Sequence, residues 1–263
     1  MNIVEERREK NPRFEIGSSS IIGTRSYQQD YGYVYTSSEE VMGIVCDGMG
    51  GLEGGERASR TAVEQMIQDF HNLRGDVPIS EFFKRTAQRM DQAVCALTGR
   101  DGKPLKAGTT LAAAYCKGSQ MYWVSVGDSK IYLIRGNEIR SVNREHNYRL
   151  MLQMQLEAGM IDQAFYIKEE KTPQAEALIS FIGMDHVKYI DVNTSPIELK
   201  PEDIIAVCSD GIYKSLNESQ VCAMILDNDL DMNIAADRLT AMALRYGVRG
   251  QDNTTAILMK YRG

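Results

Sequence analysis

Between Gly108 and Val142 the chain runs through four short apolar segments with almost nothing between them. The segments are TTLAAAYC, QMYWVSVGD, KIYLIR and EIRSV, and each is rich in the residues that favour strands. Arg135 to Glu138 carries turn residues suited to a hairpin between the last two. Strands joined by consecutive hairpins form an antiparallel sheet, so this stretch excludes a doubly wound parallel fold.

Helical and strand patterns alternate in blocks along the rest of the chain. Helical spacing of apolar residues predicts one helix pair at 62–70 and 83–97, broken at residues 71–79, and another at 217–227 and 232–246. The remaining strand candidates are FEIGSSSIIG, YGYVYT, VMGIVCD, YIDVNTSPIEL, DIIAVCSD and TTAILMKY. Strand and helix blocks without regular βαβ alternation predict the α+β class. Two antiparallel sheets packed together, each covered by a helix pair, would bury every apolar face, and we expect residues 1–263 to form a single domain.

Residues 144–186 interrupt this pattern. They are rich in Met and Gln (LMLQMQLEAGM), then polar, and then apolar at AEALISFIG, where we expect a short helix. We interpret the segment as a flap inserted over the sheet. A helical connection within the core fits its composition equally well.

Composition narrows the class of protein. Of 263 residues 43% are hydrophobic and 25% charged, and the net charge of −6 argues against a nucleic-acid partner. No apolar run approaches the ~18–20 residues of a membrane span, and the charged N-terminus lacks a signal peptide's apolar stretch, so we expect a cytoplasmic protein away from membranes. Five cysteines without a CxxC pair indicate reduced thiols, with Cys46 and Cys208 buried in apolar runs.

Four aspartates stand where apolar strands meet turns. Asp47, Asp128 and Asp210 each end such a strand, and Asp252 immediately precedes one. Any one alone is most simply a turn residue. Four on the same rim would repel one another, raising their pKa values, and a hard cation would relieve that repulsion. Oxygen ligands favour Mg²⁺ or Mn²⁺, and no His or Cys cluster has zinc spacing.

The segment DGMGGLEGG adds a second indication at the first of these aspartates. Gly48, Gly50 and Gly51 let the backbone approach whatever Asp47 holds, and they expose carbonyl oxygens as ligands. The segment is not a P-loop, because the Gly-Lys-Ser/Thr ending is missing.

Six motifs in order resemble those of the metal-dependent protein phosphatases, the type 2C Ser/Thr phosphatases, over roughly residues 17 to 261. They are RSYQQD (25–30), CDGMGG (46–51), AGTT (107–110), VGDSKIY (126–132), CSDGI (208–212) and QDNTT (251–255). The resemblance implies an αββα sandwich with a binuclear Mn²⁺ or Mg²⁺ centre between its sheets.

The resemblance also implies a set of metal ligands. Asp47 would bridge two ions, with the Gly48 carbonyl on one of them. Asp210 and Asp252 would complete the protein ligands of the other ion. Asp128, together with Asp210, would form a third and weaker site of the kind found in bacterial members.

The implied reaction is hydrolysis of phosphoserine and phosphothreonine in proteins by a metal-activated water, without a phosphoenzyme. Arg25 would grip the substrate phosphate with two parallel hydrogen bonds, and Asp30 would orient metal-bound water. Phosphorylated proteins are the expected partners, together with a cognate Ser/Thr kinase. We expect a monomer.

The chain departs from the family pattern in several places. Met49 stands where animal members carry a histidine often assigned as general acid, so water or another group must protonate the leaving alkoxide. Methionine here is familiar in bacterial members, which favours a bacterial source. The other departures are Gln28, Gln29, Lys130 and the Glu145–Asn147 segment, whose His146 we expect to pack locally.

Two other function classes stay open. One is a catalytically dead binding or regulatory module of the same fold, against which the four retained aspartates argue. The other is a phosphohydrolase of small molecules, for which the sequence supplies no aromatic or basic pocket.

Overall fold

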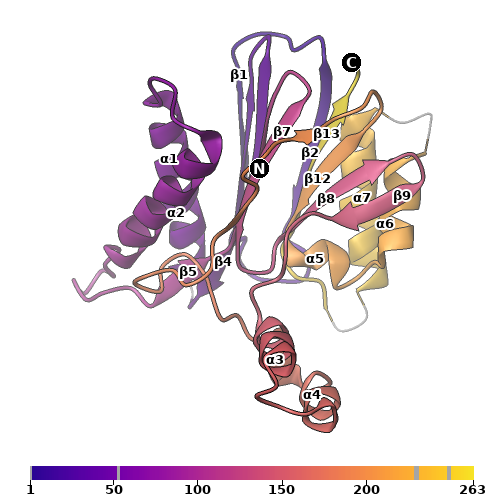
Figure 1. Cartoon of the computed structure of the whole chain (residues 1–263). Coiled ribbons are helices and arrows are strands. Elements are labelled where there is room, and N and C mark those ends of the chain that lie inside the picture. Colours follow the sequence, from indigo (N-terminus) through magenta and orange to yellow (C-terminus); the bar gives the residue numbers. More distant parts are fainter. Residues whose placement is uncertain (1, 52–53, 228–230, 248–249) are drawn as a thin grey trace.

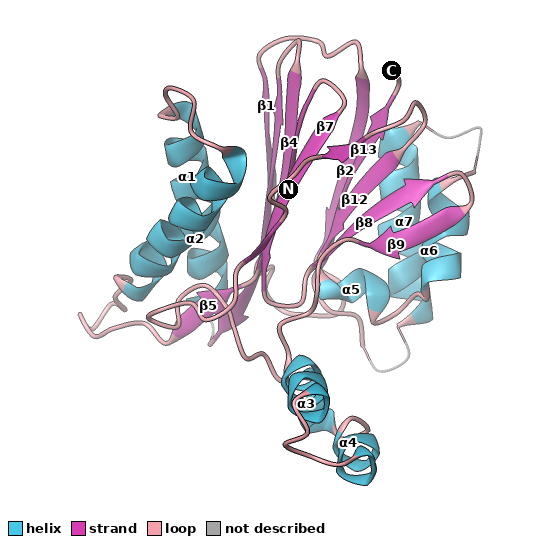
Figure 2. Cartoon of the chain, in the orientation of Figure 1, coloured by secondary structure: helices cyan, strands magenta, loops and turns pink. Residues whose placement is uncertain are grey.

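The computed structural model describes residues 2–51, 54–227, 231–247 and 250–263, and it shows two stacked β-sheets between two groups of helices (Figures 1 and 2). The larger sheet has the order β1-β3-β4-β6-β7-β10, with β5 paired to β4 and β11 to β7. Its strands are β1 (Ile3–Arg7), β3 (Asp30–Thr36), β4 (Glu40–Gly50), β5 (Ala107–Thr109), β6 (Leu111–Lys117), β7 (Gln120–Val126), β10 (Asp191–Val192) and β11 (Ile197–Glu198).

The smaller sheet has the order β2-β13-β12-β8-β9 and is antiparallel throughout. Its strands are β2 (Phe14–Ile21), β8 (Lys130–Arg135), β9 (Glu138–Ser141), β12 (Ile204–Cys208) and β13 (Thr254–Tyr261). The predicted α+β class and sandwich are confirmed.

Two features of the sheets differ from the sequence-based expectation. The four consecutive strands after Gly108 do not share one sheet, because the β6–β7 hairpin lies in the larger sheet and the β8–β9 hairpin in the smaller. The chain crosses between the sheets at Gly127 and Asp128, where Gly127 has a left-handed φ of 95°. The polar N-terminus forms β1, parallel to β3, so the larger sheet is not wholly antiparallel. Charged residues along this edge strand obscure the alternation of apolar residues that would indicate a strand.

Helices cover both outer faces. On the larger sheet lie α1 (Gly54–His71) and α2 (Ile79–Cys95), and on the smaller α5 (Asp210–Tyr213), α6 (Glu218–Ile225) and α7 (Met232–Tyr246). Each predicted helix pair is present. The first helix begins eight residues before its clear apolar periodicity, because Gly54 and Gly55 are themselves buried in its first turn.

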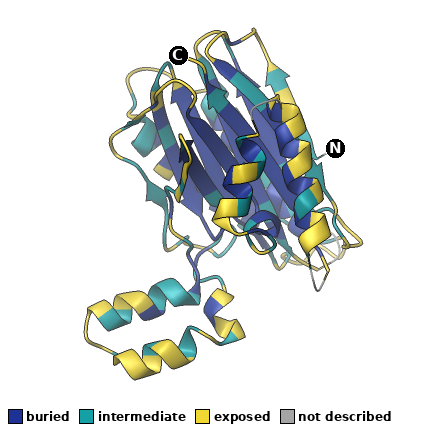
Figure 3. Ribbon diagram, turned by 90° about the vertical axis from the view of Figure 1, so that its right-hand side faces the viewer, coloured by how far each residue is buried: buried dark blue, intermediate teal, exposed yellow. Residues whose placement is uncertain are grey.

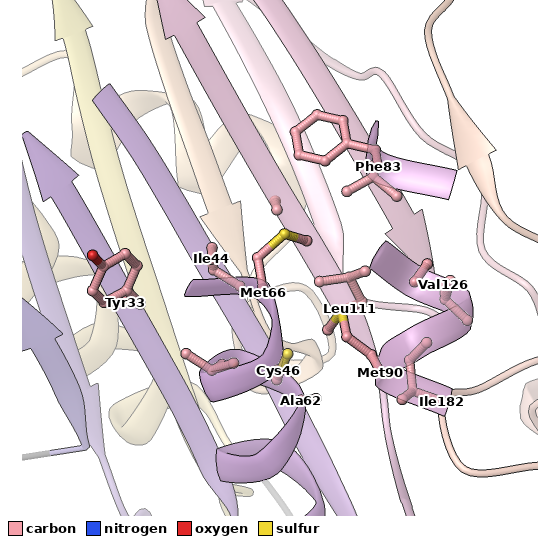
Figure 4. Packing of buried hydrophobic residues seen from close by; sticks show 14 of the residues in the cluster. Tyr33, Ile44, Cys46, Ala62, Met66, Phe83, Met90, Leu111, Val126 and Ile182 are labelled. Carbon is pink, nitrogen blue, oxygen red and sulfur yellow. The ribbon is translucent and has the colours of Figure 1, made fainter. Parts of the chain in front are cut away.

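Three apolar layers join these elements. One lies between α1, α2 and the larger sheet, where Met66 and Met90 meet Ile44 and Leu111 (Figure 4). A second fills the space between the sheets, and a third lies between the smaller sheet and its helices. The result is the predicted four-layer αββα arrangement.

The insertion at 144–186 contains α3 (Tyr148–Glu157), α4 (Gln163–Glu169) and a 3₁₀ turn, η1 (Pro173–Glu176). Its helices stand off the end of the sandwich, largely exposed, instead of lying over a sheet face (Figures 1 and 3). The helix expected at 175–183 was wrong, because only the 3₁₀ turn forms there. The chain then runs back extended, and Ile182 bridges to Thr109.

Two smaller expectations can be compared with the structure. The five cysteines are free, and Cys46 and Cys208 are buried as predicted. Among the described residues, no helix has the length and apolar character needed to cross a bilayer.

Candidate metal centre

Strand ends from both sheets meet at the end of the sandwich where α5 and the insertion lie, around a cavity of about 430 Å³. All four strand-end aspartates face this cavity, together with Arg25. The lining residues are Arg25, Gln29, Asp47, Gly48, Met49, Gly50, Thr110, Asp128, Glu176, Leu178, Asp210, Lys214, Asp252 and Asn253. The structure thus brings together the carboxylates that the sequence places far apart.

The AGTT motif holds the backbone of Asp47. The Thr110 hydroxyl accepts a hydrogen bond from the Asp47 amide at 2.9 Å, and the Asp47 carbonyl accepts from the Thr110 amide at 2.8 Å and the Thr109 hydroxyl at 2.9 Å. Thr110 is itself 2.7 Å from the Ser129 hydroxyl. This hydrogen-bond network fixes the backbone position of Asp47, and it uses both threonines of the AGTT motif.

Gly48 is required by close packing of the backbone. A Cβ at this position would lie 2.1 Å from the Gly55 carbonyl oxygen and 2.6 Å from that of Gln29. The Gly48 amide donates to the same Gln29 carbonyl at 3.1 Å. Leu52 and Glu53 of the glycine-rich segment lie outside the described residues.

Asp30 is fully buried beside this centre. One carboxylate oxygen, Oδ2, accepts hydrogen bonds from the Ser209 and Thr255 hydroxyls, each at 2.8 Å. The other, Oδ1, is buried without a partner. Burial raises the pKa of Asp30 to about 7. The hydrogen bonds from the two hydroxyls lower this pKa in part, and the negative charge on Asp210 raises it further.

Crowding of like charges extends to the neighbouring carboxylates. Burial, followed by the charges of Asp30 and Asp210, raises the pKa of Asp47 well above its ordinary range. Burial and Asp210 raise the pKa of Asp128 to about 6, although Lys214 opposes the shift. Entry of a positive charge among these carboxylates would oppose the upward pKa shifts.

Two side-chain cations neutralise part of the cluster. Arg25 Nη2 lies 2.6 Å from Asp252 Oδ2, and Lys214 Nζ is paired with Asp210 Oδ2. In the described ranges, no three Asp, Glu, His or Cys side chains are already arranged to hold an ion. The remaining donors nevertheless fit a hard divalent cation, because Asp30 Oδ1 and Asp210 Oδ1 are buried oxygens without any partner.

The QDNTT motif joins the loop that carries Arg25 to the smaller sheet. Asn253 accepts from the Gln29 amide at 2.7 Å and donates to the Ile22 and Tyr27 carbonyls, each at 3.0 Å. Gln251 donates to the Gly211 carbonyl at 2.7 Å. These two amides hold the loops on either side of Asp252, so the motif positions the cavity wall.

The departures from the family pattern have local roles. Met49 lines the cavity. The Gln28 side chain turns inward and donates to the Ser20 hydroxyl and the Ile21 carbonyl at 3.1 and 3.0 Å. Gln29 donates to the Gly50 carbonyl at 3.1 Å.

The last two departures lie near the root of the insertion. Lys130 forms an ion pair with Glu145 at 2.8 Å. His146 is fully buried, and its Nδ1 accepts from the Gly127 amide at 3.2 Å. Its Nε2 lies 3.5 Å from Asp191 Oδ2, so the buried imidazole lies between the crossing at Gly127 and β10. That His146 packs locally and takes no part in catalysis stays a prediction.

Sequence reasoning missed Lys214. It follows Asp210 by four residues, and this spacing puts two side chains on the same side of a helix. The spacing could have predicted this contact only if the start of a helix at Asp210 had also been predicted.

A family model and similar sequences indicate the family, and solved structures show the same fold. The family model described as protein phosphatase 2C matches residues 16–242. A serine/threonine phosphatase of Listeria monocytogenes is 25% identical over 240 residues, covering 90% of this chain and 91% of the relative. A serine/threonine phosphatase structure from S. agalactiae superposes with a TM-score of 0.79 at 24% identity, covering 95% of this chain and all of that one.

A further solved structure is the catalytic domain of the phosphatase PstP in complex with two manganese ions. Its TM-score is 0.71 at 22% identity, over 95% of this chain and 99% of that one. With the family model spanning most of the sequence, this chain belongs to the protein phosphatase 2C family, the metal-dependent Ser/Thr phosphatases.

Proposed function

We propose that this phosphatase hydrolyses phosphoserine and phosphothreonine esters of proteins at the cavity between Asp47, Asp210 and Asp252. The observation that carries the proposal is the meeting of these carboxylates, with two unpartnered buried oxygens, beside the guanidinium of Arg25. A negative pocket of this kind can receive a phosphate dianion only after cations have entered it.

Two divalent ions, Mn²⁺ or Mg²⁺, would be held by Asp47, the Gly48 carbonyl, Asp210 and Asp252. When bound, they supply an activated water and positive charge for attack on phosphorus. The solved PstP domain with two manganese ions is the relative that supports this number. The Asp30 carboxylate, anchored through Oδ2 by Ser209 and Thr255, has Oδ1 without a partner, and this oxygen would orient water held by the ions.

Arg25 would bind the substrate phosphate. Its guanidinium is paired with Asp252, and it would be free to bind phosphate once a cation neutralised that carboxylate. Two parallel N–H donors then suit two phosphate oxygens better than a lysine would. Because Met49 lines the cavity and has no proton to donate, water or another group must protonate the leaving alkoxide.

Several further expectations accompany this function. We propose that residues 1–263 act as one catalytic domain, with 144–186 as an insertion next to its cavity. A cognate Ser/Thr kinase, a monomeric state and a cytoplasmic site of action remain predictions. The proposal does not extend to the weaker third ion that the resemblance implies at Asp128 and Asp210, because Lys214 lies between these two carboxylates.

The test is phosphate release from a phosphothreonine peptide, a phosphotyrosine peptide and a nucleotide in parallel, with Mn²⁺ and with excess chelator. We expect turnover of the phosphothreonine peptide in Mn²⁺ and none in chelator. Inactivity at every ion concentration would favour a binding module. Faster turnover of the nucleotide would favour a small-molecule phosphohydrolase.

A further inference from the structure

Lys214 lies between the two carboxylates that the sequence assigns to a third ion. Its Nζ is paired with Asp210 Oδ2 and stands 3.9 Å from Asp128 Oδ2. The Asp128 side chain is 8% exposed and that of Asp210 10% exposed, so water cannot fully neutralise either carboxylate. The ammonium is the positive charge that the fold itself supplies to this pair.

The two oxygens of Asp210 are divided between different tasks. Oδ2 meets Lys214, whereas Oδ1 is buried without a partner. Oδ1 is therefore available to an ion in the main pair, but the oxygen that a third ion would share with Asp128 is already taken. With Oδ1 given to the main pair, Asp210 has no free oxygen for a third ion.

The fold fixes the backbone from which the Lys214 side chain, itself 45% exposed, reaches the two aspartates. It caps α5, and its amide donates to the Asp210 carbonyl at 3.0 Å. The Tyr213 hydroxyl donates to the Asp128 carbonyl at 3.0 Å, which ties the helix to the crossing between the sheets. Lys130 lies over the Tyr213 ring at 4.3 Å and is paired with Glu145. Lys130 therefore pairs with Glu145, and Lys214 is the lysine that pairs with the aspartates.

We propose that the Lys214 ammonium takes the place of a third divalent ion between Asp128 and Asp210, so that this chain holds two ions and one tethered cation. The inference rests on the proposed two-ion centre. A tethered group competes at an effective concentration of about millimolar, and an entering ion would have to displace it. A dication beside a retained ammonium would also be repelled.

The experiment counts bound Mn²⁺ on the full chain by following free Mn²⁺ with electron paramagnetic resonance during a titration. We expect two ions on the wild type, three on Lys214→Met, and two on the control Lys130→Met, which removes a neighbouring lysine outside the aspartate pair. Adding Asp128→Asn to Lys214→Met should return the count to two. Lys214→Gln serves as a second variant should the methionine disturb folding, which a thermal melt in chelator reports.

The outcomes separate this inference from the proposed function. Three ions on the wild type, or two on both Lys214 variants, overturn the inference and leave the two-ion centre standing. A phosphate-binding role for Lys214 would appear as an unchanged ion count with a raised KM for phosphopeptide, which also overturns it. Fewer than two ions on the wild type would overturn the two-ion centre and this inference together.

Discussion

Asp30 and Asp47 are direct partners on the β3–β4 ladder, so their side chains leave the same face of the sheet next to each other. Like charges in such a pair destabilise a sheet. Both residues lie where burial already disfavours a charge, and their pKa values are raised accordingly. The fold therefore carries a strained acidic pair that a bound cation can relieve.

This strain predicts an unusual pH dependence in chelator. The raised pKa of Asp30, about 7, means that the folded protein binds more protons than the unfolded chain between about pH 4 and pH 7. Its free energy of unfolding should therefore fall as pH rises through this window, by up to about 1.4 kcal/mol per pH unit for each such proton. Asp47 and Asp128 act with the same sign.

Urea denaturation at several pH values, with chelator and with saturating Mn²⁺, measures this effect. Saturating Mn²⁺ should flatten the slope, since bound ions keep the carboxylates charged, and Asp30→Asn should reduce it in chelator. Burial would raise the pKa of Asp191, but hydrogen bonds and charges from His146 and Arg144 lower it overall. Asp191 therefore affects stability only at pH values below this window. Stability that rises from pH 4 to pH 7 in chelator would contradict the prediction.

Asp47→Asn should abolish turnover without harming the fold. Loss of the shared ligand removes several kcal/mol of transition-state stabilisation, so we expect a decrease on the order of a thousandfold in phosphate release from a phosphothreonine peptide. In chelator the variant should be at least as stable as the wild type, because a buried carboxylate with a raised pKa is gone. The exposed Asp237→Asn on α7 is the matched control. Turnover near the wild-type rate would remove Asp47 from the centre.

Arg25→Lys tests the phosphate-binding assignment. A lysine keeps the charge but loses the paired N–H donors, so kcat/KM for a phosphothreonine peptide should fall about tenfold to a hundredfold. The number of bound Mn²⁺ ions should stay the same. Arg85→Lys, an exposed arginine on α2 that pairs with Glu81, should leave kcat/KM unchanged. Equal kinetics for both variants would show that Arg25 does not touch the phosphate.

Asp91→Ala should destabilise the C-terminal end of the insertion, where the chain returns to the sandwich. The Asp91 carboxylate on α2 accepts four backbone hydrogen bonds: from Gly183 at 2.7 Å, Met184 at 3.0 Å, His186 at 2.9 Å and Val187 at 3.3 Å. Losing them should cost about 2–3 kcal/mol of unfolding free energy in urea. Asp101→Ala, which removes an exposed acceptor of one such bond, should cost less than about 0.5 kcal/mol. Similar losses in both variants would contradict the anchoring role.

Local pattern was sufficient for most of the architecture. The runs that become β4, β7, β12 and β13 are continuously apolar, which indicates strands buried on both faces. The 3.6-residue spacing of α1, α2 and α7 is unbroken, so the sequence alone indicates the buried face of each helix. If two packed sheets are assumed, the aspartates at strand ends are likewise predicted to lie together at one end of the sandwich. The family resemblance then indicated how each of them serves the reaction.

Only the tertiary structure decided what depends on contacts between distant residues. Sequence does not say that β1 pairs in parallel with β3, that the hairpins β6–β7 and β8–β9 belong to different sheets, or that the chain returns extended at Ile182. Nor does it say that Lys214 meets Asp210. Periodicity records which side of an element is buried, because burial acts on each residue separately. Pairing partners and charge contacts are chosen by the whole fold, because they depend on which surfaces remain once the core has packed.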